Sequence, residues 1–183
     1  MSTSGEARLR DGRAVGFTAA PYDSPVAQAL VAAVQREYVV RYGGPDVAAV
    51  DPAEFVGPVG LFLVASVDGV PAGCAAWRVH TEGVVEVKRV YVAAAYRRQG
   101  LAHLLMDALE ASIVAAGHRM VVLNTGDRQP EAIALYAARD YRPTSRYGVY
   151  AESSGAVFLG KRLVAPGDDG HPHEEQEEQP WAS

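Results

Sequence analysis

The chain is poor in cysteine, in basic charge and in long apolar runs, and each shortage excludes a class of protein. Its 183 residues include one cysteine, Cys74, so neither an internal disulfide framework nor a cysteine-built zinc site is available. No apolar run reaches the roughly 18–20 residues that a membrane span requires. The segment from Met1 to Gly12 is polar and lacks the apolar core of a secretory signal. We therefore expect a cytoplasmic protein that makes no membrane contact.

A basic surface of the kind that binds nucleic acid is also missing. The chain carries 17 Lys and Arg against 22 Asp and Glu, a formal net charge of −5. Six of the acids lie between residues 164 and 183, where there is no Lys or Arg, so the rest of the chain has 17 bases against 16 acids. Nucleic-acid binders normally show a basic excess, and we expect no such partner. The sequence does not fix the oligomeric state, and a homodimer is an open alternative.

Composition places a single domain between two polar ends. Residues 1–13 and 164–183 are small, polar and charged, and we expect both to be disordered. His171 and His173 in the second end resemble a metal-binding pair, but no further ligand accompanies them, and we expect no metal site. Residues 14–163 have the length and apolar content of one folded domain.

Periodicity within this domain alternates between strands and helices. Ser24 and Pro25 have the residue types that open a helix, and Asp68-Gly69 is typical of a hairpin turn. The expected strands cover residues 15–19, 61–67, 72–79, 84–92, 120–123, 146–150 and 156–163, and the expected helices cover 25–42, 100–116 and 130–139, with an ambiguous stretch at 46–55. This order predicts a mixed α/β fold with a largely antiparallel sheet.

The most informative segment joins the strand at 84–92 to the helix at 100–116. Its loop contains Arg97 and Arg98 and then Gly100, which removes the Cβ that would hold a ligand away from the backbone. The first turn of the helix adds free N–H groups and the positive end of the helix dipole. Together these features favour a phosphate or pyrophosphate. The spacing matches neither a P-loop nor a dinucleotide-binding loop.

The sequence Arg97-x-x-Gly100-x-Ala102 resembles the signature of the GNAT superfamily of acetyl-CoA-dependent N-acyltransferases. Residues 86–92, 121–125 and 132–141 are similar, in the same order, to the family's central strand, to its following strand and to its Ala-x-x-Leu-Tyr…Gly-Phe/Tyr segment. Asp140 stands where many relatives have glycine, which we interpret as a local change in the turn. The resemblance implies a GNAT-type fold, in which a mostly antiparallel sheet flanked by helices is splayed at the cofactor cleft.

The resemblance also implies that acetyl-CoA is the cosubstrate. Its pyrophosphate would lie on the main-chain amides of residues 98–103, its pantetheine arm along the strand edge at 90–92, and its thioester carbonyl near an N–H of that strand. Asn124 resembles the family's polar group that contacts the arm or a water. The implied cofactor-binding residues are Val90, Tyr91, Val92, Arg97, Arg98, Gln99, Gly100, Leu101, Ala102, His103, Asn124 and Tyr136.

The implied reaction is direct attack of an amine on the acetyl thioester, which requires a group that takes the amine proton. Glu86 lies eleven positions before Arg97, the offset at which some relatives carry a general-base glutamate. The alternative is a Glu86 that pairs with neighbouring cations at a sheet surface. Strict strand alternation would put Val90 on the side of Glu86, and Arg89 and Tyr91 on the other side, unless a bulge intervenes.

Tyr136 resembles the family residue that returns a proton to the leaving thiolate, although an aromatic at this position also packs the helix against the sheet. Cys74 lies on an expected strand without an apparent histidine partner, so we expect a small buried hydrophobe and not an acyl-carrying nucleophile. The catalytic residues implied by the resemblance are therefore Glu86 and Tyr136.

The implied function is an N-acetyltransferase that acts on a primary amine of a small molecule. We expect the acceptor site to be framed by aromatic residues together with an acid, namely Tyr38, Tyr42, Tyr147 and Tyr150 with Glu82 or Glu37. A protein lysine or N-terminal acetyltransferase is one alternative, and a non-catalytic acyl-CoA-binding regulatory module is another. The identity of the acceptor and the preferred acyl chain cannot be read from the residues.

Overall fold

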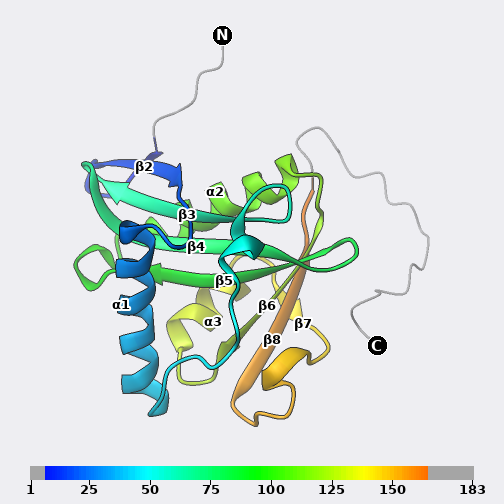
Figure 1. The fold of residues 1–183 in the computed structure, drawn as a ribbon. Coiled ribbons are helices and arrows are strands. Elements are labelled where there is room, and N and C mark those ends of the chain that lie inside the picture. The colour runs from blue at the N-terminus through cyan, green and yellow to red at the C-terminus, as the bar shows by residue number, and fades with distance from the viewer. Residues whose placement is uncertain (1–6, 165–183) are drawn as a thin grey trace.

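The computed structural model describes residues 7–164, which form one sheet with helices on both faces (Figure 1). The helices are α1 (Pro25–Tyr42), α2 (Leu101–Ala115) and α3 (Pro130–Ala137), with short 3₁₀ turns η1 (Pro52–Phe55), η2 (Ala94–Tyr96) and η3 (Gly148–Tyr150). The strands are β1 (Ala7–Arg8), β2 (Ala14–Ala19), β3 (Gly60–Val67), β4 (Val70–Thr81), β5 (Val84–Val92), β6 (Met120–Gly126), β7 (Arg142–Pro143) and β8 (Ala156–Arg162). The expectations for residues 165–183, including the His171–His173 pair, lie outside the described residues.

The sheet has eight strands in the order β1-β2-β3-β4-β5-β6-β8-β7. Neighbouring strands are antiparallel except for β5 and β6, which run parallel and are joined through α2. A parallel pair needs such a crossover, because a hairpin can connect only antiparallel strands. The mixed α/β fold with a largely antiparallel sheet is confirmed. Within residues 7–164, no helix is both long enough and apolar enough to cross a membrane.

Side-chain alternation along β3 separates two apolar layers. Phe62 and Val64 pack with α1 on one face, whereas Leu63 and Ala65 pack with α2 on the other. In Figure 1, α1 lies in front of the sheet and α2 lies behind it. The buried face of α2 consists of Leu101, Leu105, Met106, Leu109 and Ile113. Both faces of the central strands are therefore covered, which explains their nearly continuous apolar sequences.

The local signals that open and close the elements act as expected. The Ser24 hydroxyl accepts a hydrogen bond from the N–H of Ala27, and Gly43 ends α1 in the left-handed conformation at φ 81°. Asp68 and Gly69 both have positive φ, 48° and 79°, as a two-residue hairpin turn requires. The ambiguous stretch at 46–55 contains η1, which Asp51 caps with its side chain.

The expectation of disorder over residues 1–13 is wrong for residues 7–13, which are folded. Ala7 and Arg8 pair with β2, and the side chain of Leu9 is 4% exposed within the core. The N–H of Arg10 donates to the carbonyl of Gln99 at 3.2 Å. One apolar anchor and main-chain pairing are enough to fix a segment whose composition is otherwise polar. Residues 1–6 lie outside the described part of the chain.

The strand expected over 146–150 is also wrong, because this segment forms a loop that ends in η3. Its aromatic and β-branched residues favour a strand, but Gly148 adopts φ 64°, which a strand does not accommodate. The Arg146 guanidinium donates to the carbonyls of Ala151 and Ser153 and holds the loop closed. Tyr147 packs its ring against Phe158.

Asp140 ends α3 in a conformation that favours glycine. It adopts the left-handed conformation at φ 64°, and the N–H of Tyr141 donates to the carbonyl of Tyr136 at 3.1 Å to close the end of α3. Asp140 therefore bears a backbone strain that glycine at this position would avoid. The neighbouring contact with Arg142 is solvent-exposed and adds little stability.

Asp140→Gly should stabilise the fold by about 0.5–1 kcal/mol, because glycine adopts positive φ without a Cβ clash. The expected rise in melting temperature is about 1–3 °C by calorimetry. Asp140→Ala is the matched control, since it removes the same carboxylate and keeps the Cβ. A rise of equal size in both variants would show that charge, and not backbone strain, is responsible.

Candidate active site

A cleft opens where β5 and β6 separate. The two strands pair only at Val84–Met120, Val85–Val121 and Glu86–Val122. Beyond Glu86, β5 stays with β4 as far as Val92, while β6 stays with β8 over its whole length. Each strand thus keeps its antiparallel partner, and the parallel pairing between β5 and β6 ends after Glu86. The resulting cleft has a volume of about 1690 Å³.

A β-bulge in β5 redirects the side chains that face this cleft. Cys74 is opposite Tyr91 and Ala76 is opposite Lys88, so a single residue of β4 faces both Arg89 and Val90. Arg89 takes the extra position with φ 57°.

The bulge changes which face each residue occupies. Val90 packs with Val87 in the layer under α2, whereas Tyr91 packs on the side of α1. The exception allowed for in the expected alternation therefore applies, and Arg89 joins Lys88 on the α1 side.

The N-terminus of α2 lines the cleft through Gly100 and the first residues of the helix. Gly100 is its N-cap at φ 92° and provides no side-chain cap, so the N–H groups of Leu101 and Ala102 have no side-chain acceptor there, whereas the N–H of His103 donates to the Gly100 carbonyl at 3.1 Å. Arg98 has φ 61°, and together the two left-handed residues fold the loop tightly against the end of β5. This is the geometry of an anion site at a helix N-terminus.

The expected cofactor-binding residues meet at this cleft with one exception. Those that line it are Val90, Tyr91, Val92, Arg97, Arg98, Gly100, Leu101, Ala102, His103, Asn124 and Tyr136. Gln99 does not line the cleft. Its side-chain amide donates to the carbonyl of Ala95 at 3.0 Å, and its amide oxygen accepts from Arg13. Gln99 therefore attaches the loop to the N-terminal hairpin and not to the cleft.

The side chain of Arg97 folds back onto the C-terminal end of β5. Its Nε donates to the carbonyl of Val92 at 2.8 Å, and its guanidinium pairs with Glu37 of α1. The same guanidinium lies 5.8 Å from the centre of the Tyr91 ring. The cation is thus held between α1 and the edge of β5, next to the opening.

Tyr136 comes from α3 and reaches the cleft from a well-packed position. Tyr136 is 6% exposed, and the centre of its ring lies 5.6 Å from the centre of the Tyr141 ring. Burial raises the pKa of Tyr136, and nearby Tyr38 raises it further. The phenol is therefore protonated at neutral pH and can donate a proton.

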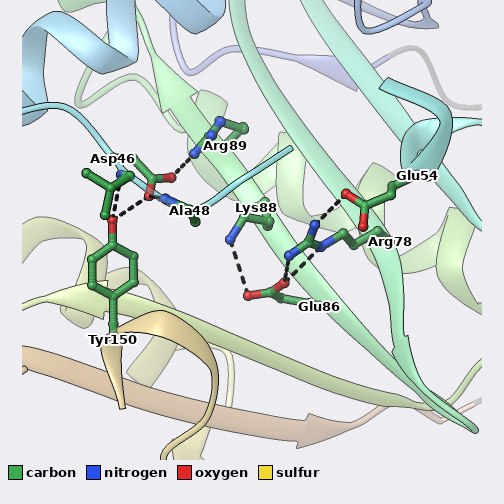
Figure 2. A network of polar contacts seen from close by, with 9 residues as sticks. Asp46, Ala48, Glu54, Arg78, Glu86, Lys88, Arg89 and Tyr150 are labelled. Atoms are coloured by element: carbon green, nitrogen blue, oxygen red, sulfur yellow. Dashed lines mark hydrogen bonds and ion pairs between the residues drawn. The ribbon is translucent and has the colours of Figure 1, made fainter. Parts of the chain in front are cut away.

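Glu86 occupies a buried network of charges. Its carboxylate receives Arg78 at 3.0 Å on one oxygen and Lys88 at 3.3 Å on the other, and Arg78 also pairs with Glu54 (Figure 2). Lys88 lines the cleft and Glu86 does not. This arrangement matches the ion-paired alternative considered for Glu86, with Lys88 placed between its carboxylate and the opening.

A second charged cluster was not predicted from the sequence. Asp46, in the loop after α1, pairs with Arg89 and accepts hydrogen bonds from Tyr150 at 2.5 Å and from the N–H of Ala48 at 2.9 Å (Figure 2). Burial alone would raise the pKa of Asp46, but the bonds from Tyr150 and Arg89 outweigh it and lower that pKa. The cluster joins three chain segments at the wall of the cleft.

The expected acceptor residues are only partly assembled. Tyr38, Tyr42 and Tyr150 line the cleft, as does Glu37. Burial raises the pKa of Tyr38 to about 12, although the Arg89 charge opposes the shift.

Tyr147 does not line the cleft, so this expectation is wrong, and of the two acids considered Glu37 lines the cleft and Glu82 does not. Tyr147 packs against His80 and Phe158, and its hydroxyl is buried. Glu82 belongs to the turn before β5, at the other end of the strand from the opening.

The C-terminal end of α1 closes one side of the opening. Arg41 donates to the carbonyl of Arg128 at 2.8 Å and pairs with Glu131 at the start of α3, and Arg128 donates to the carbonyl of Arg41 at 2.9 Å. The Tyr42 ring packs directly over Gly126, where a Cβ would lie 2.0 Å from the hydroxyl oxygen. These contacts hold the C-terminal end of α1 against the end of β6.

Cys74 lies below the cleft and not in it. Its thiol is fully buried against the α1 layer and donates to the carbonyl of Arg89 at 3.3 Å. Burial raises the pKa of Cys74 to about 12, so the reactive thiolate is scarce at neutral pH.

Comparison with known proteins fits this geometry. Residues 27–141 match the acetyltransferase (GNAT) family. The chain is 34% identical over 103 residues to an IAA acetyltransferase from Azospirillum brasilense, a match that covers 56% of the chain and 67% of that relative.

Two solved structures illustrate the likeness of the fold. An inferred acyl-CoA N-acyltransferase from Klebsiella pneumoniae has a TM-score of 0.68 at 29% identity, covering 82% of this chain and 98% of the other. A GNAT family acetyltransferase from Elizabethkingia anophelis with acetyl-CoA bound has a TM-score of 0.61 at 14% identity, covering 81% and 98%. The splayed sheet, the uncapped start of α2 and the family match over residues 27–141 identify the chain as a member of the GNAT acetyltransferase family.

Proposed function

We propose that this protein transfers an acetyl group from acetyl-CoA to a primary amine of a small molecule. The observation that carries the proposal is the parting of β5 from β6 beside the uncapped N-terminus of α2. An extended pantetheine arm fits an unpaired strand edge, and a diphosphate fits a helix start with Arg98 beside it. Acetyl-CoA supplies the activated thioester, and the chain supplies binding groups and proton transfer.

A small acceptor is favoured over a protein chain by the closure of the cleft wall. The loop after α1 is attached to η3 through Asp46 and Tyr150, and the end of α1 is attached to α3 through Arg41. In Figure 1 this loop crosses in front of β5 and β6. A protein substrate would need an open groove at this place, whereas a small amine needs only a narrow entrance.

The chemical roles follow from position. Main-chain N–H groups near Val90 to Val92 would face the acetyl oxygen and stabilise the negative charge that develops there. Tyr136 would give its proton to the departing thiolate. Lys88 would first give one of its protons to the Glu86 carboxylate across their 3.3 Å contact, and its neutral amine would then accept the proton of the attacking amine.

Acetyl-CoA should raise the melting temperature of the purified protein, because a ligand that binds only the folded state stabilises it. At 100 times the Kd the expected gain is about 2.7 kcal/mol. Gly100→Asp should abolish the shift, since it places a carboxylate where the diphosphate would lie. The activity itself is measured as free thiol released with a panel of small amines and lysine peptides. An absent shift at millimolar acetyl-CoA, or release with peptides alone, would contradict the proposal.

Tyr136→Phe should lower kcat by about 100-fold while the melting shift with acetyl-CoA is kept, because the proton donor is lost and the ring remains. Tyr141→Phe is the matched control: it also removes a buried hydroxyl, one that bonds to Glu110 at 3.1 Å and not to the cleft. Equal losses in both variants would indicate that packing, and not proton donation, explains the effect.

Glu86→Gln tests the proton path through its pH profile. An alkyl amine has a pKa near ~10.4, so the variant should lose about 100-fold in kcat/KM at pH 7 and progressively less toward pH 10. Lys88→Met should behave alike if the path runs through Lys88. Glu54→Gln removes a charge from the same network at a greater distance from the cleft and serves as the control. A profile parallel to that of the wild type would assign Glu86 a purely structural role.

A further inference from the structure

Arg89 has a backbone conformation that is costly for a residue with a long side chain. Its φ of 57° lies in the left-handed region, in the middle of a strand whose other residues are extended. Such residues persist only where the surroundings hold them in place. Arg89 is also 5% exposed, so its charge must be compensated inside the protein.

Asp46 supplies that compensation from outside the sheet. Its carboxylate pairs with one terminal nitrogen of Arg89 and is itself only 11% exposed. Tyr150 and the N–H of Ala48 fix the carboxylate from two further directions. In Figure 2 the Asp46 carboxylate lies between the Arg89 guanidinium and the Tyr150 hydroxyl, beside the strand. The side chain of Arg89 is therefore drawn to the α1 face and held there.

The bulge determines how the next residues of β5 meet the cleft. With it, Val90 packs under α2 and Tyr91 turns to α1. Without it, the strand would slip by one residue, and every later side chain would change face. Arg89 would then enter the apolar layer under α2 without a partner. The Asp46–Arg89 pair thus favours the bulged arrangement, in which the main-chain edge of residues 90–92 faces the gap between β5 and β6.

We propose that Asp46 is a positioning residue for acetyl transfer. By holding Arg89 in the left-handed bulge, it sets the main chain of Val90 to Val92 where the acetyl oxygen is to be stabilised. Asp46 acts through Arg89 and does not touch the reacting atoms. The inference rests on the proposed function, because the bulge matters for catalysis only if the thioester contacts the main-chain edge of residues 90–92.

Two substitutions of Arg89 separate backbone geometry from side-chain recognition. Arg89→Gly and Arg89→Ala both delete the guanidinium, but only glycine adopts positive φ without strain. Arg89→Ala should lower kcat by about 10- to 100-fold, as expected when a stabilising group is misplaced. Arg89→Gly should stay within about threefold of the wild type. Equal effects in both variants, or a raised KM for the amine with unchanged kcat, would overturn the proposal in favour of substrate recognition by the guanidinium.

Asp46→Asn provides the second arm. It leaves Arg89 without its anion and should lower kcat about as much as Arg89→Ala, and the double variant Asp46→Asn/Arg89→Gly should recover most of the loss. This double variant contains no unpaired buried charge, so it also answers the case in which Asp46→Asn folds poorly. Asp51→Asn is the matched control, because it removes a carboxylate from the same connection and retains a side chain that can cap η1. Simple addition of the two losses would refute the coupling.

Amide hydrogen exchange of peptides covering residues 85–92 reads the backbone directly, without activity. Exchange should be about tenfold faster in Asp46→Asn and Arg89→Ala than in the wild type and close to wild type in Arg89→Gly. Unchanged exchange in Asp46→Asn would overturn the positioning role even if kcat fell. If the wild-type protein released no thiol with any amine, the proposed function would fail, while the exchange rates would still decide whether Asp46 holds the bulge.

Discussion

The site depends on the way β5 divides its hydrogen bonding between two neighbours. It stays paired with β4 to its end, but it stays paired with β6 for three residues only. Because β6 in turn remains with β8, the sheet separates along the parallel pairing of β5 with β6, and each of the two strands keeps its antiparallel neighbour. The cleft, the approach of α2 from behind and the position of α3 beside β6 all follow from this separation. An enzyme of this family gains an unpaired main-chain edge in the interior of a sheet, where such edges are otherwise avoided.

The charges around the opening are matched in pairs instead of forming a field of one sign. Arg89 has Asp46, Arg97 has Glu37, Arg41 has Glu131, and Glu86 has two cations. The pairs of Arg89, Arg97 and Arg41 also join segments that are distant in sequence, so these charges also set the shape of the wall. Removing one partner from a buried pair costs several kcal/mol, more than the pair contributes, because the remaining charge stays in a poor solvent. This applies to the Asp46–Arg89 pair and to the cations on Glu86, whereas the pairs of Arg97 and Arg41 are partly exposed and contribute less.

The sequence was sufficient where the signals were local. The bounds of β5, the capping of α1 by Ser24 and the hairpin at Asp68-Gly69 follow from short patterns that the structure confirms. The loop with Gly100 could be predicted to lie at the cleft because its signature lies in consecutive residues.

What could not be predicted depends on contacts between distant segments. Asp46, Arg89 and Tyr150 are more than forty residues apart from one another, and nothing near Asp46 distinguishes it from an ordinary loop acid. The bulge has no sequence signature, since Arg89 is neither glycine nor asparagine. The strand assigned to 146–150 failed because Arg146 binds carbonyls of the same loop, a contact that propensities do not register.

The attachment of Gln99 to the N-terminal hairpin has a practical consequence for anyone redesigning the chain. A domain boundary drawn by family resemblance at residue 14 would discard Leu9, Arg10 and Arg13. Arg10 and Arg13 bind Gln99 and so support the loop before α2, where we propose that the diphosphate binds. Tyr136 would remain, but the cleft would lose Arg10 from its lining and the loop would lose its support. Expression vectors and fusion partners should therefore join the protein ahead of Ala7, where the hairpin begins.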